Sequence, residues 1–342
     1  MILCSVKVLF TISIGEKMKN KRLLLLITLF CIICIYSNAQ TGHASHIYSV
    51  RFSHDGTQIF SGSNDGTIKQ WDIETGRVIK TFTGHTRPIR TISLSLDGKQ
   101  ILSGSTDYTI KLWDVETGRE IRTFTGHTNT IFSVCFSPDG KQFLSGSNDR
   151  TCKLWDIETG REIRTFAGHT RGILSISYHP NGNQFLSASF DGTIKLWDIN
   201  TGNETGTFTV MNTGVLLSVD TVNFNSDGTQ FLSGSFDRII RLWDMDTGKV
   251  IRTFTGHGDS ISTAIFSPDG TKILSGANDL RLWDIETGNQ IRIFPRIGGS
   301  VRSVSFSPDG KQFVFCGADD TNVRLLDTTT GMVIRIFSGL ER

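Results

Sequence analysis

The sequence predicts an all-β fold in which one four-stranded unit is repeated until the units close on themselves. Two observations support this prediction: a regular repeat period, and short segments in which apolar and polar residues alternate. The dipeptide Trp-Asp occurs at Trp71, Trp113, Trp155, Trp197, Trp243 and Trp283, and Leu326-Asp327 occupies the equivalent place in a seventh copy. Successive copies lie 40 to 46 residues apart, which is a period typical of repeat architectures.

The third repeat shows the four predicted strands in order. They are residues 131–137 (IFSVCFS), 141–147 (KQFLSGS), 151–157 (TCKLWDI) and 161–166 (REIRTF). Each segment is short and alternates apolar with polar residues, as half-buried strands do. Ser-Pro-Asp-Gly and Glu-Thr-Gly separate the segments, and glycine in such turns takes positive φ without steric cost. Each repeat is therefore predicted to be an antiparallel four-stranded meander.

A sheet of this kind has two apolar faces and cannot bury both of them alone. Neighbouring sheets must therefore stack, and a closed ring leaves no end sheet exposed. Repeat 7 ends with its own fourth strand at residues 332–337 (MVIRIF). We therefore expect the ring to close by side-chain packing between the first and last sheets, without a strand borrowed from residues 34–41.

Several spaced motifs recur together with the Trp-Asp dipeptide. Gly-His precedes the first strand (Gly84-His85, Gly126-His127, Gly168-His169), Ser-Gly-Ser-x-Asp ends the second, and Lys-Leu-Trp-Asp ends the third. In these features the chain resembles the WD-repeat (WD40) β-propeller family over residues 42–339. The resemblance implies a seven-bladed β-propeller with four antiparallel strands per blade, used as a rigid interaction platform. A shared fold does not by itself establish a function.

The resemblance also implies a hydrogen-bonded network that ties each intact blade together. It joins the His before the first strand, a Ser of the second strand, the Asp of the next turn and the Trp of the third strand, whose indole N–H needs a partner when buried. The sequence leaves open which Ser of Ser-Gly-Ser takes part. The other members are His43, Asp65, Trp71, His85, Asp107, Trp113, His127, Asp149, Trp155, His169, Asp191, Trp197, His257, Asp279 and Trp283.

The recurring His, Ser and Asp residues also have the composition of a catalytic triad. A triad is needed once, beside a substrate pocket, whereas this set recurs in five repeats with the same order. We therefore assign these residues to the architecture and predict no catalytic residue. The sequence contains no HExxH, paired CxxC, phosphate-loop or EF-hand motif, so neither a metal site nor a cofactor is predicted.

Three repeats depart from the pattern. Repeat 5 replaces Gly-His by the longer segment 209–218, and repeat 6 shortens the turn between its second and third strands. Repeat 7 has Gly298-Gly299 in place of Gly-His and Leu326 in place of Trp. Because blade 7 lacks most of the predicted network, we expect it to open first.

Residues 1–39 do not belong to the repeats. From Met18 to Ala39 the chain has a basic start, an apolar stretch at 23–36 and a small-residue end, which is the pattern of a secretory signal peptide. Met18 is therefore a candidate translation start, and residues 40–342 form the predicted propeller. The alternative is a membrane anchor through residues 23–36, but a span needs about 20 apolar residues. We expect a secreted or cell-envelope protein, in contact with the membrane only if this segment is uncleaved.

Charge and cysteine content restrict the class of partner. Residues 1–39 contain five Lys or Arg and one Glu, so the formal charge falls from +2 to −2 without them. A nucleic-acid partner would require a basic surface. We therefore predict that the protein does not bind nucleic acid. Cys135, Cys152 and Cys316 remain, an odd and scattered set that is no disulfide framework. We interpret them as small core residues, with an intermolecular bridge as the alternative.

The family resemblance places the first strand's start and the turn after the second strand on one face. Residues at these positions that are predicted to bind a partner are Tyr48, Arg90, Phe132, Leu174, Phe190, Phe236 and Arg302. Phe190 and Phe236 occupy turn positions where other repeats have Asn or Thr, and aromatic and Arg side chains dominate binding hot spots. In the alternative, both phenylalanines fold inward and cap the core, because exposed phenylalanine is unfavourable.

Two functions of different classes are compatible with these features. The first is a non-enzymatic scaffold, exported from the cytoplasm, that binds a protein or peptide. The second is an exported hydrolase or small-ligand-binding propeller that uses the central channel. Near-uniform repeats, whose polar residues already have structural roles, favour the scaffold.

Overall fold

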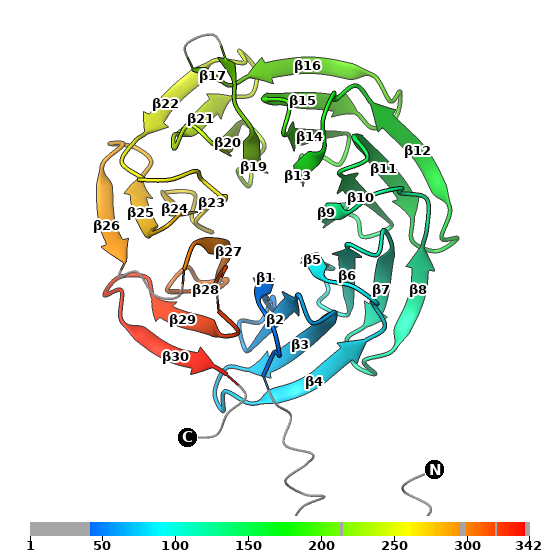
Figure 1. The fold of residues 1–342 in the computed structure, drawn as a ribbon. Helices are drawn as coiled ribbons and strands as arrows, with labels where there is room; N and C mark the ends of the chain where they lie inside the picture. The colour runs from blue at the N-terminus through cyan, green and yellow to red at the C-terminus, as the bar shows by residue number, and fades with distance from the viewer. Residues whose placement is uncertain (1–41, 213–214, 295–298, 319, 339–342) are drawn as a thin grey trace, which may run out of the picture. The chain divides into compact units, whose positions relative to one another are not determined.

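The computed structural model describes residues 42–212, 215–294, 299–318 and 320–338. The chain divides into residues 1–40 and residues 41–342, and the predicted signal segment at 1–39 lies outside the described residues. The described part of the chain consists of β-strands and their connections, arranged as a seven-bladed β-propeller, as predicted (Figure 1). Within these ranges no helix is long and apolar enough to span a membrane.

Each blade is a four-stranded antiparallel meander, whose strands we call a to d from the ring centre outward (Figure 1). Blade 1 contains β1 (Ile47–Phe52), β2 (Gln58–Ser63), β3 (Thr67–Asp72) and β4 (Val78–Thr83). Blade 2 contains β5 (Ile89–Leu94), β6 (Gln100–Ser105), β7 (Ile110–Asp114) and β8 (Glu120–Phe124). Blade 3 contains β9 (Ile131–Phe136), β10 (Gln142–Ser147), β11 (Thr151–Asp156) and β12 (Glu162–Ala167).

The remaining blades follow the same order. Blade 4 contains β13 (Ile173–Tyr178), β14 (Gln184–Ser189), β15 (Thr193–Asp198) and β16 (Glu204–Thr209). A two-stranded hairpin, β17 (Met211–Asn212) and β18 (Val215–Leu216), precedes blade 5, which contains β19 (Val219–Phe224), β20 (Gln230–Ser235), β21 (Ile240–Asp244) and β22 (Val250–Phe254). Blade 6 contains β23 (Thr263–Phe266), β24 (Lys272–Gly276), β25 (Leu280–Asp284) and β26 (Gln290–Phe294). Blade 7 contains β27 (Val301–Phe306), β28 (Gln312–Gly317), β29 (Val323–Asp327) and β30 (Val333–Phe337).

The core lies between the blades, and aromatic side chains connect them. The ring of Phe124, at the end of strand d in blade 2, lies 5.8 Å from the ring of Trp155 in blade 3, edge to face. The same contact joins Phe166 to Trp197 at 5.7 Å. Burying one Trp removes about 150–250 Å² from water, worth roughly 4–6 kcal/mol before entropy costs. A blade without its neighbour would lose this burial, which is why the unit must be repeated.

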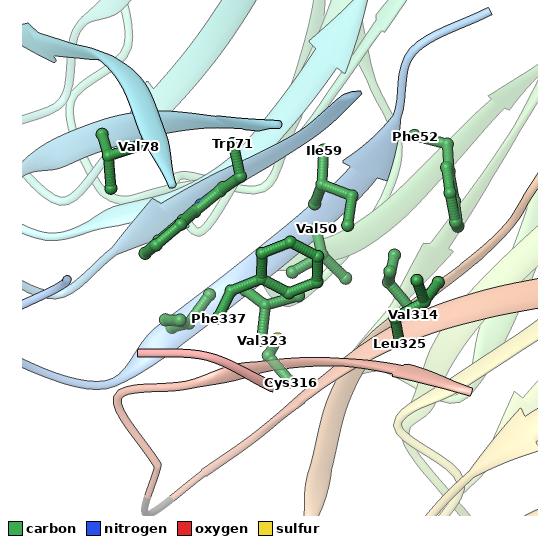
Figure 2. Packing of buried hydrophobic residues seen from close by; sticks show 11 residues of the cluster. Val50, Phe52, Ile59, Trp71, Val78, Val314, Cys316, Val323, Leu325 and Phe337 are labelled. Atoms are coloured by element: carbon green, nitrogen blue, oxygen red, sulfur yellow. The ribbon is translucent and has the colours of Figure 1, made fainter. Parts of the chain in front are cut away.

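Blades 1 and 7 close the ring through side chains. Phe337 of strand d in blade 7 packs edge to face on Trp71 of blade 1 at 5.9 Å, within a buried cluster drawn from both blades (Figure 2). One backbone hydrogen bond, from Ile47 N to Asp320 O at 3.3 Å, also joins them. Blade 7 thus has four strands contiguous in sequence. Whether residues 34–41 also pair with it lies outside the described residues.

Candidate interaction site

The repeated polar residues form one hydrogen-bonded chain per intact blade. In blade 3, Trp155 Nε1 donates to Ser145 Oγ at 2.8 Å, Ser145 Oγ lies 2.7 Å from His127 Nε2, and His127 Nδ1 lies 2.7 Å from Asp149. Because the Ser145 oxygen accepts from the indole, its hydrogen points to His127 Nε2, and His127 donates from Nδ1 to the carboxylate. The first Ser of Ser-Gly-Ser is therefore the member that the sequence left open.

The same chain occurs in the other four blades that have a Gly-His pair. Its members there are His43, Ser61, Asp65 and Trp71; His85, Ser103, Asp107 and Trp113; His169, Ser187, Asp191 and Trp197; and His257, Ser275, Asp279 and Trp283. The Ser hydroxyls of these chains are fully buried, so they cannot reach a substrate. The role of each hydrogen-bonded chain is to hold the turn after strand b against the loop before strand a.

The electrostatics of the chain favour an ionised carboxylate and a neutral imidazole. Burial alone would raise the pKa of Asp65, but hydrogen bonds from His43 and Thr67 hold that pKa well below its usual value. Burial lowers the pKa of His43 and of His257, so both are neutral at pH 7. The same balance as at Asp65 lowers the pKa values of Asp107, Asp149 and Asp191.

Blades 5 and 7 lack the His but not the buried carboxylate. In blade 5, Arg241 of strand c pairs with Asp237 at 2.5 Å, and in blade 7 Arg324 pairs with Asp320. Both arginines occupy the position that is Lys69 in blade 1. The turn of each blade is therefore held by a cation from strand c instead of an imidazole from the preceding loop. The sequence analysis missed this replacement because a Lys-to-Arg change in strand c looks like ordinary surface variation.

The face of the ring that carries the turns between strands b and c is here called the upper face. In each blade one residue of strand a, or in blade 6 the residue just before it, lies near this face and lines a central channel with a volume of about 380 Å³. These residues are Tyr48, Arg90, Phe132, Leu174, Asp220, Ser262 and Arg302. Five of the seven residues predicted to bind a partner therefore line one channel.

Arg90 joins the predicted residues of three blades. Its guanidinium carbon lies 3.9 Å from the centre of the Tyr48 ring and 5.4 Å from that of Phe132, within the range of cation–π attraction. The Phe132 ring lies edge to face with Phe190 at 6.3 Å. We call Tyr48, Arg90, Phe132 and Phe190 the aromatic row; it runs from the channel to the turn of blade 4.

Phe190 and Phe236 lie at the surface and do not cap the core. Their exposed fractions are 40% and 59%. Their backbones make the ordinary turn contacts, from Phe190 N to Gly172 O at 3.0 Å and from Phe236 N to Ser218 O at 2.9 Å. The backbone conformation of these turns therefore does not require an aromatic side chain at either position.

Two further apolar residues are exposed in the connections near this face, and the sequence analysis missed both. Leu216 of the β17–β18 hairpin is 48% exposed and lies beside Gly192, in the turn that carries Phe190. Tyr108 is 41% exposed, and its φ of 69° places it in the left-handed region. In the sequence, the longer loop of repeat 5 could have indicated that Leu216 is exposed. Tyr108 could have been noticed because it stands where repeats 1 and 4 have a glycine in the same turn.

The charge of the channel is positive. Arg51, Arg90 and Arg302 outnumber Asp220, which is the single carboxylate among the lining residues. Arg51 Nη1 donates to Val50 O at 2.7 Å and to Ser303 Oγ at 3.2 Å. Burial raises the pKa of Asp220, against the hydrogen bond from Ser218 and the charge of Arg302. In the described ranges, no group of three His, Cys, Asp or Glu side chains is arranged to hold a metal ion.

The three described cysteines are free thiols. Cys152 and Cys316 are fully buried, and burial raises the pKa of Cys316 to about 12. Both are core residues, as the sequence predicted. Cys135 is half-buried and lines the channel, and burial also raises its pKa.

Seven segments of the chain match the family model described as WD domain, G-beta repeat: residues 34–72, 76–114, 118–156, 160–198, 203–244, 248–284 and 288–327. The chain belongs to the WD40 repeat family. From the second onward, each matched WD40 segment begins in or just before strand d of one blade and ends with strand c of the next, so it spans a junction between blades. WD40 propellers are generally protein-interaction scaffolds and typically non-catalytic. No curated protein matches the chain.

Proposed function

We propose that this WD40 propeller is a non-enzymatic scaffold, exported from the cytoplasm, that binds a protein or peptide at its upper face. The observation that carries the proposal is the exposure of Phe190 and Phe236 on the face where the aromatic row meets the channel. Exposed apolar surface beside Arg and Tyr is typical of interaction sites.

The size of the expected contribution follows from the exposed area. A phenylalanine side chain that is half exposed presents about 100 Å² to water, and burying that area under a partner is worth about 2–3 kcal/mol. Phe190 and Phe236 together would therefore contribute most of the difference between strong and undetectable capture, since about 1.4 kcal/mol corresponds to a tenfold change in affinity.

The double variant Phe190→Asn with Phe236→Asn tests the site, because Asn is the residue of the same turn in blades 1 and 3. The full chain serves as bait for proteins of the native cell envelope or culture medium, and captured partners are identified by mass spectrometry. We expect the variant to lose at least tenfold of the captured partner while its Tm stays within about 3 °C of the parent, because exposed side chains contribute little to stability.

A matched control replaces Ile121 and Ile163 by Asn. Both are 46% exposed in the outer strands, away from the upper face, and their replacement should leave capture unchanged. Undiminished capture by the Phe190/Phe236 variant would show that the partner binds elsewhere. A large fall in its Tm would show that these side chains belong to the core.

The proposal that the protein is exported rests on the signal-like segment before residue 40 and needs its own test. The intact mass of protein isolated from its native source should correspond to a chain that begins near Gln40. A mature chain that retains Met18 would instead favour the membrane anchor through residues 23–36.

The alternative is an exported hydrolase or a small-ligand binder that uses the channel. A volume of about 380 Å³ lies within the range of ligand sites. However, among the described residues that line the channel Asp220 is the single acidic one and none is a His, whereas hydrolysis usually requires a pair of acid–base groups or a metal. Stoichiometric metal in the purified protein would favour this alternative over the scaffold.

A further inference from the structure

Most junctions between neighbouring blades share one contact, made by the third residue of strand d, here called the clamp residue. It reaches the turn between strands c and d of the next blade, here called the receiving turn. In blade 2 the clamp residue is Arg122, whose Nη2 donates to Glu158 O at 2.9 Å and whose Nη1 donates to Thr159 O at 3.2 Å. A guanidinium thus bridges two backbone carbonyls across the junction.

Five other junctions contain an equivalent cation. Arg164 donates to Asn200 O at 3.0 Å and to Thr201 O at 3.1 Å, Arg252 to Thr287 O at 3.0 Å, Arg292 to Thr330 O at 3.0 Å, and Lys80 to Val115 O at 2.8 Å. Arg335 of blade 7 lies against Gly76 in the receiving turn of blade 1, where a Cβ would be 2.8 Å from its Nη1. The receiving turn is therefore a site for a cationic side chain.

The junction between blades 4 and 5 is the exception, because its clamp residue is Gly206. Its receiving turn has the same fold as the others, with Asp246 and Thr247 in the places of Glu158 and Thr159. Within the described part of the chain, no donor forms a hydrogen bond with the carbonyl oxygens of Asp246 and Thr247. Two acceptors that are paired at the junction between blades 2 and 3 are thus left to solvent here.

A groove with a volume of about 880 Å³ opens at this junction, and Gly206, Phe208, Met245 and the turn residues Asp246 to Gly248 line it. Phe208 is only half-buried, whereas Phe124, its counterpart in blade 2, is buried. Asp227, in the turn between strands a and b of blade 5, also lines this groove. The groove therefore combines an aromatic wall, two carbonyl acceptors and two carboxylates.

We infer that this groove binds an arginine side chain supplied by a partner protein. The protein's own clamp residues show the hydrogen bonding, since the planar guanidinium of Arg122 donates to two carbonyls of one turn. At this groove Phe208 adds an aromatic face on which a guanidinium can lie. Asp227 and Asp246 provide the charge complementarity. A lysine can also reach two carbonyls, as Lys80 does at Val115 O and Glu116 O, but its ammonium has neither the flat face nor the fork of donors.

This site is separate from the one proposed at the upper face. Besides strand residues such as Gly206 and Phe208, its lining comes from the turns between strands a and b and between strands c and d. These turns lie at the opposite ends of the strands from Phe190 and Phe236. The two sites can therefore be occupied together, and the arginine site stands whether or not the upper face binds a partner.

The first test uses N-acetyl-arginine amide as the probe, with the citrulline analogue as a neutral control of the same shape. Amide resonances of residues 205–208 and 245–248 in the folded protein should shift saturably with the arginine probe at millimolar concentration, and not with citrulline. Absence of saturable shifts, or equal shifts with both probes, would overturn the inference.

Two variants give opposite expectations. Gly206→Arg should fill the groove from within, abolish the probe shifts and raise Tm. A side chain fits, because a Cβ on Gly206 would meet Leu196 at 3.6 Å; Gly206→Ala adds that Cβ without a cation and should still bind. Arg122→Gly should create a second site, because Asp139 and Glu158 stand there in the places of Asp227 and Asp246, so that Glu158 and Thr159 also shift. Unchanged binding by Gly206→Arg, or no new shifts in Arg122→Gly, would contradict the inference.

Discussion

Replacing the network serine by alanine should cost more in blade 3 than in blade 5. Ser145 serves two buried partners, the indole N–H of Trp155 and Nε2 of His127. Ser233 of blade 5 accepts from Trp243 at 2.8 Å, and that blade has no Gly-His pair. The same change therefore leaves two buried polar groups unpaired in Ser145→Ala and one in Ser233→Ala.

The expected magnitudes follow from these partners. A buried donor or acceptor left without a partner costs about 1–3 kcal/mol. Ser145→Ala should thus destabilise the protein by about 2–6 kcal/mol and Ser233→Ala by about 1–3 kcal/mol. Blade 7 supports this coupling, because Phe315 and Leu326 replace the Ser and the Trp together, and both are buried.

Urea unfolding at pH 7.5, followed by tryptophan fluorescence and by circular dichroism, measures the difference. Both variants should keep the parent's m-value, and the midpoint of Ser145→Ala should be clearly lower than that of Ser233→Ala. Ser53→Ala, in an exposed turn between strands a and b, is a control that should cost under about 1 kcal/mol. Equal midpoints for Ser145→Ala and Ser233→Ala would refute the reasoning, since His127 would then contribute nothing through the serine.

The remaining predictions concern pH and local opening. Burial lowers the pKa of His43 and His257, so below the unfolded value of about 6.5 the unfolded chain binds more protons and the urea midpoint should fall. The lowered pKa of Asp65 should add a second loss below about pH 4, and a midpoint that is constant from pH 7.5 to pH 5 would contradict this account. In hydrogen exchange, amides of β29 in blade 7 should exchange faster than those of β11 in blade 3, because Leu326 replaces the Trp and no imidazole is bound. If the amides of blade 7 exchanged most slowly, the ion pair of Arg324 would compensate fully for the missing Trp and His.

The sequence by itself determined the strands, the repeat and the members of the network. Strand alternation and turn glycines are local properties, and the recurrence of His127, Asp149 and Trp155 at fixed spacing needs no knowledge of distant contacts. The sequence could not show which serine takes part, because both serines of Ser-Gly-Ser lie on the same face of strand b. They differ only in the side chains that each one contacts in the folded blade.

The tertiary structure decided which side chains remain exposed and which contacts are missing. Phe190 could cap the core or face solvent, and the decision depends on Phe132 and the channel mouth, in the neighbouring blade. Gly206 is one substitution in an outer strand, and the sequence does not show what it removes. The consequence becomes clear only from the structure, where Arg122 at the equivalent position reaches a carbonyl 36 residues further along the chain. Contacts between blades join residues about one repeat apart, so a pattern within one repeat cannot show them.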